Sequence, residues 1–313
     1  MRMRRTLAFL LFGFCVLAVA VKGRTADVRS GDWTIHKSEE GGKVEFSLIE
    51  HRHGGSSDHV SDWPIASFQG VDFSKSGRQE VHFTVLRDAG KIECEGYLSD
   101  GEGAGLFHFQ PDPNYVRQMR GLDFPVDEEQ QYSMAVLNVS LEFARQIRGE
   151  HLSDLDTEKL VAFRIHGVDS AFIDDIRAAG LKISDSDKLV AFRIHGVTPQ
   201  MIRAVHAAGY SPDEDTLIAM RIHGATPEWI AELKSRGYDH VELEKLIAFR
   251  IHGVSPDFIE KLQGLGYQHP EPDQLVAMRI HGVSPEYISN LRSRGMQNLS
   301  IDQLVSMRIH GIE

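Results

Sequence analysis

Apolar positions in the C-terminal two-thirds of the chain follow the spacing of an amphipathic helix, and the pattern returns about every 29 residues. Each copy ends in Arg-Ile-His-Gly, and the histidines of successive copies are separated by 29, 28, 29, 29 and 29 residues. The six copies of this motif are Arg164–Gly167, Arg193–Gly196, Arg221–Gly224, Arg250–Gly253, Arg279–Gly282 and Arg308–Gly311. A period of this length predicts a repeat array in which every unit buries its apolar face against its neighbours.

A first helix is predicted directly after each motif. Four copies continue with Ser or Thr and then Pro, as in Thr198-Pro199, which is typical of an N-cap followed by proline at the first helical position. Val197 and Ile202 have the spacing of a hydrophobic staple around that cap. A glycine, the residue type expected just past a helix end, stands ten residues after the proline position in five copies: Gly180, Gly209, Gly237, Gly266 and Gly295.

A second helix is predicted to end in Arg-Ile-His. Ten residues before each repeat histidine stands an acid or a serine suited to an N-cap: Asp156, Asp185, Asp213, Glu242, Glu271 and Ser300. The same register extends back through Asp127 to Asp112-Pro113. We therefore expect seven two-helix units, 14 helices in all, over residues 111–313. Helices of about ten residues are marginal alone, so stacking must supply their stability.

Residues 24–110 show the alternation of β-strands. Val81, Phe83 and Val85 alternate with polar residues, and similar stretches cover 33–36, 43–49, 91–98 and 106–109. We expect a small antiparallel β domain, with a glycine-rich turn over 99–105. Cys94 falls on the apolar side of one strand, where a buried structural thiol is expected. The predicted fold class is α+β, a β domain followed by an α-solenoid.

Residues 1–20 have the pattern of a signal peptide, with three arginines before the apolar run 7–21. We expect a periplasmic or secreted protein; the alternative is an inner-membrane anchor formed by an uncleaved signal. Cleavage removes three arginines, so the net charge falls from -11 to -14. A strongly acidic body argues against nucleic acid as the partner. No second long apolar run is present, so no membrane span is expected after cleavage.

The repeated arginines and histidines allow two interpretations. In the structural one, each arginine bonds an acid or carbonyl of a neighbouring unit, and each histidine lies in the last helical turn, near free carbonyls. In the other, histidines of adjacent units share a metal ion, but no further ligand recurs at a fixed position. These repeated arginines and histidines, which would form a structural ladder along the array, are Arg164, His166, Arg193, His195, Arg221, His223, Arg250, His252, Arg279, His281, Arg308 and His310.

Other chemistry has little support in the sequence. His51, His53 and His59 are candidate metal ligands, although their spacing matches no known template, and a solvated loop is the alternative. We find no zinc-peptidase, nucleophile-elbow or P-loop motif, so we expect no enzyme activity and no cofactor.

The first helices vary most between copies, and a constant frame with a variable surface is how a solenoid presents a binding face. One position of these helices is a candidate partner-binding face, with core between units as the alternative: Phe172, Met201, Trp229, Phe258 and Tyr287. A protein or peptide partner is expected.

The segment Leu275–Ile288, followed by Leu-Arg-Ser-Arg-Gly at 291–295, resembles short helical repeats of exported bacterial proteins of unknown function. Similar repeats are appended to BlaR-type antirepressor membrane metallopeptidases, and the segment 87–107 looks like the β region that precedes such arrays. The resemblance implies a location in the cell envelope and, as an alternative function, a regulatory module acting with a membrane peptidase or sensor. This chain lacks the zinc-peptidase motif, so proteolysis is not implied.

Overall fold

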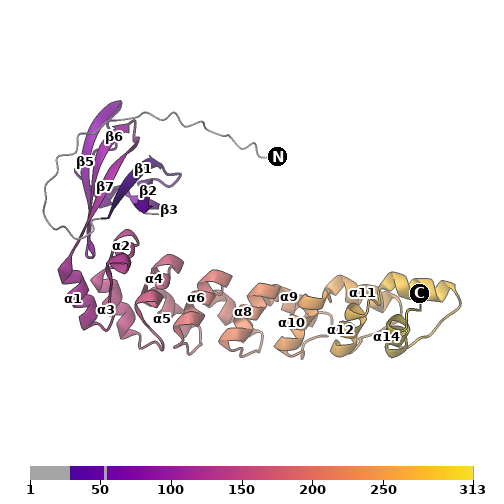
Figure 1. The fold of residues 1–313 in the computed structure, drawn as a ribbon. Helices are drawn as coiled ribbons and strands as arrows, with labels where there is room; N and C mark the ends of the chain where they lie inside the picture. The colour runs from indigo at the N-terminus through magenta and orange to yellow at the C-terminus, as the bar shows by residue number, and fades with distance from the viewer. Residues whose placement is uncertain (1–28, 53–54, 313) are drawn as a thin grey trace.

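The structure, a computed structural model, describes residues 29–52 and 55–312. A β domain stands at one end of a long rod of paired helices (Figure 1). The predicted fold class is therefore confirmed. The expected signal peptide lies outside the described residues. Among the residues that are described, no helix is long and apolar enough to span a membrane.

The β domain is one curled antiparallel sheet whose strand order is β3-β2-β1-β7-β6-β5-β4. Its concave side is filled by aromatic side chains, with Trp33 and Phe46 fully buried and both in edge-to-face contact with Phe83. The strands are β1 (Ser30–Lys37), β2 (Lys43–Arg52), β3 (Gly55–Pro64), β4 (Phe68–Gln69), β5 (Arg78–Arg87), β6 (Gly90–Ser99) and β7 (Glu102–Pro111).

The turn expected over 99–105 is present but shorter: Asp100 and Gly101 form it, whereas Gly103 and Gly105 lie within β7. These glycines pair with β6, where Gly105 faces Gly96. A Cβ at Gly105 would lie 1.9 Å from the Glu95 carbonyl oxygen, and one at Gly96 would lie 2.9 Å from the Trp33 ring. Glycine is therefore needed here for close approach of the strands and of the buried indole rather than for a turn.

The described part of the array contains the 14 expected helices, arranged as seven pairs. The first helices of the pairs are α1 (Pro113–Gly121), α3 (Leu141–Gly149), α5 (Ser170–Ala178), α7 (Pro199–Ala207), α9 (Pro227–Lys234), α11 (Pro256–Gly264) and α13 (Pro285–Ser293). The second helices are α2 (Glu128–Val136), α4 (Thr157–His166), α6 (Ser186–His195), α8 (Glu214–His223), α10 (Leu243–His252), α12 (Pro272–Ile280) and α14 (Ile301–Ile309).

The helix ends follow the predicted signals. Thr198 accepts a hydrogen bond from the Met201 backbone N–H and is followed by proline, as expected of the N-cap. Gly167 ends α4 with φ of 70°, and Gly209 follows α7 with φ of 91°. Both values lie in the left-handed region, so glycine lets the chain reverse at each helix end without steric cost.

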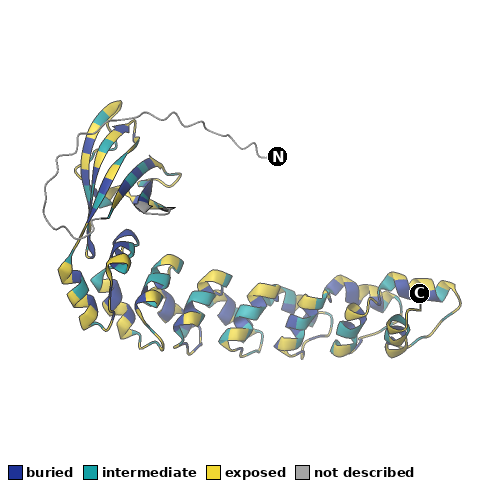
Figure 2. Cartoon of the chain, viewed as in Figure 1, coloured by how far each residue is buried: buried dark blue, intermediate teal, exposed yellow. Residues whose placement is uncertain are grey.

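The helices form two rows along the rod. Each second helix packs against the next, from α4 through α14, and most consecutive first helices do the same. The buried residues lie between the rows and between units, so the core runs the length of the rod (Figure 2). Leu160 and Phe163 of α4 are fully buried in it. Their counterparts are also fully buried in every later unit, except that Met307 of α14 is partly buried.

The β domain is fixed to the first units by hydrogen bonds and rings. Gln131 of α2 donates from its amide nitrogen to the carbonyl oxygens of Ala89 and Asp112, at 2.7 and 2.9 Å. Tyr132 of the same helix stacks on Phe107 of β7. These contacts between the β domain and α2 place strands β1–β3 on the side of the rod where α2 and α4 lie (Figure 1).

Candidate functional site

Five of the six repeated arginines connect their unit to the previous one through a backbone carbonyl. The Nε atom of Arg221, Arg250 and Arg279 donates to the carbonyl oxygen of the histidine that ends the preceding second helix, at 3.1 to 3.2 Å. Arg164 does the same to Leu137, and Arg308 to Gly282. These carbonyls lack partners within their own helices, so the arginine ladder satisfies them.

The same arginines cover the aromatic residues of the first helices. The guanidinium carbon lies between 3.8 and 5.2 Å from the ring centroid in five units. The pairs are Arg164–Phe143, Arg193–Phe172, Arg250–Trp229, Arg279–Phe258 and Arg308–Tyr287. Each pair is a cation–π contact between the first and the second helix of one unit. The carbonyl ladder was expected from sequence, but the ring contact was not.

The histidines do not share this regularity. In the described part of the chain, His310 is the only repeat histidine whose ring is hydrogen-bonded, from Nδ1 to the Ser306 carbonyl oxygen at 2.8 Å. Three of the others, His195, His223 and His252, contribute their backbone carbonyls to the arginine ladder. No group of three or more metal-ligating side chains is found among the described residues.

A second ladder, which sequence reasoning missed, joins the first helices. His206 Nδ1 lies 3.2 Å from the Ala179 carbonyl oxygen, and Arg292 donates to the Leu265 carbonyl oxygen. Arg177 donates to both the backbone oxygen and the carboxylate of Glu150. The residue type differs from copy to copy, and this variation hid the common role.

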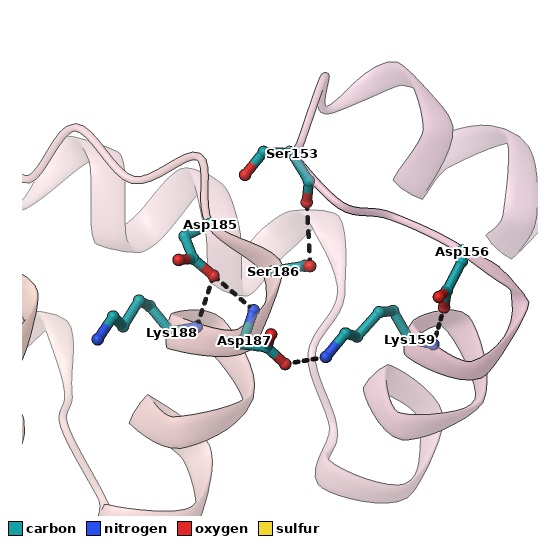
Figure 3. Close-up of polar contacts among 7 residues, drawn as sticks. All are labelled: Ser153, Asp156, Lys159, Asp185, Ser186, Asp187 and Lys188. Atoms are coloured by element: carbon teal, nitrogen blue, oxygen red, sulfur yellow. Dashed lines mark hydrogen bonds and ion pairs between the residues drawn. The ribbon is translucent and has the colours of Figure 1, made fainter.

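A third set of contacts lies at the N-terminal ends of the second helices (Figure 3). Lys159 pairs with Asp187 of the next unit, Lys188 with Asp215, and Lys245 with Asp273. The Ser186 hydroxyl donates to the Ser153 carbonyl oxygen at 3.0 Å. Because the aspartates are mostly exposed, the lysine–aspartate pairs contribute little to stability individually.

The candidate partner-binding position of the first helices lies mostly inside the molecule. Phe172, Met201, Phe258 and Tyr287 are at most 9 % exposed, and Trp229 is partly buried against the core. Arginines on the second helix of the same unit lie over four of these five side chains. They are therefore not available as an exposed face, and the alternative interpretation, core between units, describes their position.

The apolar surface that the array does expose comes from the isoleucine of each motif. These side chains are 53 to 58 % exposed in all six copies. They form the isoleucine row: Ile165, Ile194, Ile222, Ile251, Ile280 and Ile309. Val and Ala residues one turn earlier, such as Val276 and Ala277 of α12, are partly exposed beside it. The row could have been found in the sequence, since a residue five positions after a buried leucine points away from the core.

The candidate metal ligands of the β domain are only partly placed. His53 and the side chain of His51 lie outside the described residues. His59 belongs to β3 rather than to a loop, and its Nε2 lies 3.4 Å from the Ser61 hydroxyl. Burial lowers the pKa of His59, although the charge of Asp58 opposes this effect.

A cavity of about 790 Å³ lies where the β domain meets the array. We call it the junction cavity. Residues of β2, β3, β5, α2 and α4 line it, and among them is Ile165, the first member of the isoleucine row.

Comparisons of this chain with protein-family models, with curated proteins and with solved structures found no match. The class of the molecule therefore follows from its own geometry: a β domain joined to a helical repeat array.

Proposed function

We propose that this protein is a non-enzymatic scaffold of the cell envelope that binds a peptide or an extended protein segment along the isoleucine row. One observation supports this function above all others. Six large apolar side chains stay more than half exposed at the same position of six consecutive units. Single exposed apolar residues are ordinary, but a row of this length is typical of an interaction surface.

The isoleucines are not required for stacking of the units. Leu217 and Met220 of α8 are fully buried, whereas Ile222 of the same helix is 55 % exposed. The core positions and the ladders already hold the units together. A repeat array that kept isoleucine here for folding alone would gain almost nothing from it, because little of its surface is removed from water.

The spacing of the row defines the form of the ligand. Packed helices lie about 8–10 Å apart, so successive isoleucines recur at about that distance. A polyproline II peptide rises about 3.1 Å per residue and turns once every three residues, about 9.3 Å. An extended peptide with an apolar side chain at every third position would therefore contact one isoleucine per turn. Exposed repeat arginines such as Arg250 and Arg279 are adjacent in sequence to the isoleucines of the row, and they could bind carbonyl or carboxylate groups of the peptide.

The location in the envelope is proposed from the signal-like pattern of residues 1–20 and from the resemblance of the repeats to those of exported proteins. The same resemblance is compatible with a scaffold that acts beside a membrane peptidase or sensor.

A synthetic peptide of repeated Leu-Ser-Pro triplets, labelled with fluorescein, tests the proposed function. Its control has the same residues in an order that never places one leucine three positions after another. Fluorescence anisotropy should show saturable binding of the triplet peptide and at least tenfold weaker binding of the control. Equal binding of both peptides, or no binding of either up to about 1 mM, would contradict the proposed ligand.

A further inference from the structure

The junction cavity has the size of a small-molecule site, since such sites usually enclose about 300–1,000 Å³. Part of its wall is apolar, with Leu48, Trp63, Tyr132 and Val136 among the lining residues. Two arginines line it as well, Arg87 of β5 and Arg164 of α4. Asp58 and Asp62 of β3 complete its charged groups.

The guanidinium group of Arg87 is incompletely bonded. Its carbon lies 4.7 Å from the centroid of the Trp63 ring, and one terminal nitrogen donates to the Leu86 carbonyl oxygen at 3.2 Å. Its Nε atom is buried and has no hydrogen-bond partner. Leaving a buried N–H of a charged group without a hydrogen-bond acceptor costs free energy. The Nε atom of Arg87 therefore indicates a site at which a ligand could supply the missing acceptor.

Arg164 brings a second positive charge to the same cavity. Its Nε bonds the Leu137 carbonyl, but no acid pairs with it in the described residues. Neither Asp58 nor Asp62 forms an ion pair with either arginine in that part of the chain. Burial lowers the pKa of Arg87, and the positive charge of Arg164 lowers this pKa further. Two arginines that line one cavity and form no ion pair among the described residues favour binding of an anion between them.

The cavity is continuous with the isoleucine row. Ile165 is the first isoleucine of that row and lines the cavity, while Arg164 is the first arginine of the ladder. A peptide on the row would therefore reach the cavity at its β-domain end. We propose that Arg87 and Arg164 bind the C-terminal carboxylate of that peptide, and that its last side chain enters the apolar part of the cavity. This inference rests on the proposed function.

The first test uses the whole protein and a small mimic of a peptide end. N-acetyl-leucine carries the acylated nitrogen, the apolar side chain and the free carboxylate, whereas N-acetyl-leucinamide differs only in lacking the charge. NMR of the tryptophan indole N–H groups reports on the cavity through Trp63, and the buried Trp33 serves as an internal reference. The acid should shift the Trp63 signal saturably, and the amide should not. Equal shifts with both compounds, or none with the acid, would overturn the inference.

The variant Arg87→Met should weaken binding of N-acetyl-leucine at least tenfold while leaving the Trp33 signal in place. Arg78→Met is the matched control, because Arg78 also lies over an aromatic ring, that of Tyr97, at 4.4 Å, but does not line the cavity. Unchanged binding in Arg87→Met would contradict the assignment. A loss of the same size in both variants would contradict it equally.

The triplet peptide, made as a free acid and as an amide, separates this inference from the proposed function. Tighter binding of the acid, by tenfold or more, supports both. Equal binding of the two forms overturns the carboxylate site and leaves the isoleucine row as the binding surface. No binding of either form overturns both.

Discussion

The guanidinium carbon of Arg279 on α12 lies 5.0 Å from the centroid of the Phe258 ring, which belongs to α11, the first helix of the same unit. The same guanidinium donates through Nε to the His252 carbonyl oxygen at 3.2 Å. One side chain thus covers an aromatic ring of its own unit and satisfies a carbonyl at the helix end of the preceding unit. This double contact explains why the arginine recurs as strictly as the buried leucine.

Two other arginines of the ladder allow the contributions of the ring contact and of the carbonyl hydrogen bond to be measured separately. Arg193 lies 3.8 Å from the Phe172 ring centroid but forms no hydrogen bond to a carbonyl among the described residues. Arg221 bonds the His195 carbonyl, but its unit has Met201 at the position where other units have an aromatic residue. Arg193→Met and Arg221→Met should each lower the free energy of unfolding by about 0.5–1 kcal/mol.

Arg279→Met should cost more, about 1–2 kcal/mol, because both contacts are lost together. Urea unfolding followed by circular dichroism gives the three values. Equal destabilisation by all three substitutions would show that the ring and the carbonyl do not contribute independently.

Gly105→Ala should destabilise the β domain by about 3 kcal/mol, because the added methyl group would meet the Glu95 carbonyl oxygen at 1.9 Å. Gly41→Ala is the control, since a Cβ at Gly41 has nothing within 4 Å. Thermal unfolding of the two variants should show a lowered transition for the first and an unchanged one for the second. A tolerated alanine at position 105 would contradict the strand pairing of β6 and β7.

Cys94 should be unreactive in the folded protein. It is buried, and burial raises the pKa of its thiol well above the usual range, so almost no thiolate is present at neutral pH. Ellman's reagent at pH 8 should therefore modify Cys94 only after denaturant is added. Rapid modification of Cys94 under native conditions would show that its strand opens readily.

A single unit should not fold alone, because its core is completed by its neighbours. A peptide covering residues 225–253 should give the circular dichroism spectrum of a largely unfolded chain, whereas residues 197–313 should give a helical spectrum and a cooperative melt. A helical, cooperatively melting single unit would contradict stabilisation by stacking.

The sequence predicted the helices well because their ends are fixed by local rules. A serine or threonine before proline, as at Thr198, and a glycine after the last turn, as at Gly209, act through their own backbone and need no tertiary contact. The register of these signals was therefore sufficient to place all seven units.

The features that sequence reasoning missed depend on contacts between distant residues. Gly105 looked like part of a turn, and only the approach of β6 and the Trp33 ring shows that it belongs to a strand. The junction cavity joins Arg87 and Arg164, which are far apart in the chain. The isoleucine row differs, because its signal was in the helical period and was overlooked beside the more conspicuous arginine and histidine.

The most direct test of the proposed role is the binding of the fluorescent triplet peptide to the variant Ile222→Ser, Ile251→Ser, Ile280→Ser. These side chains are exposed, so the variant should melt close to the unaltered protein, but it should bind the peptide at least tenfold more weakly. Peptide binding of undiminished strength in a folded variant would contradict the isoleucine row as the binding surface.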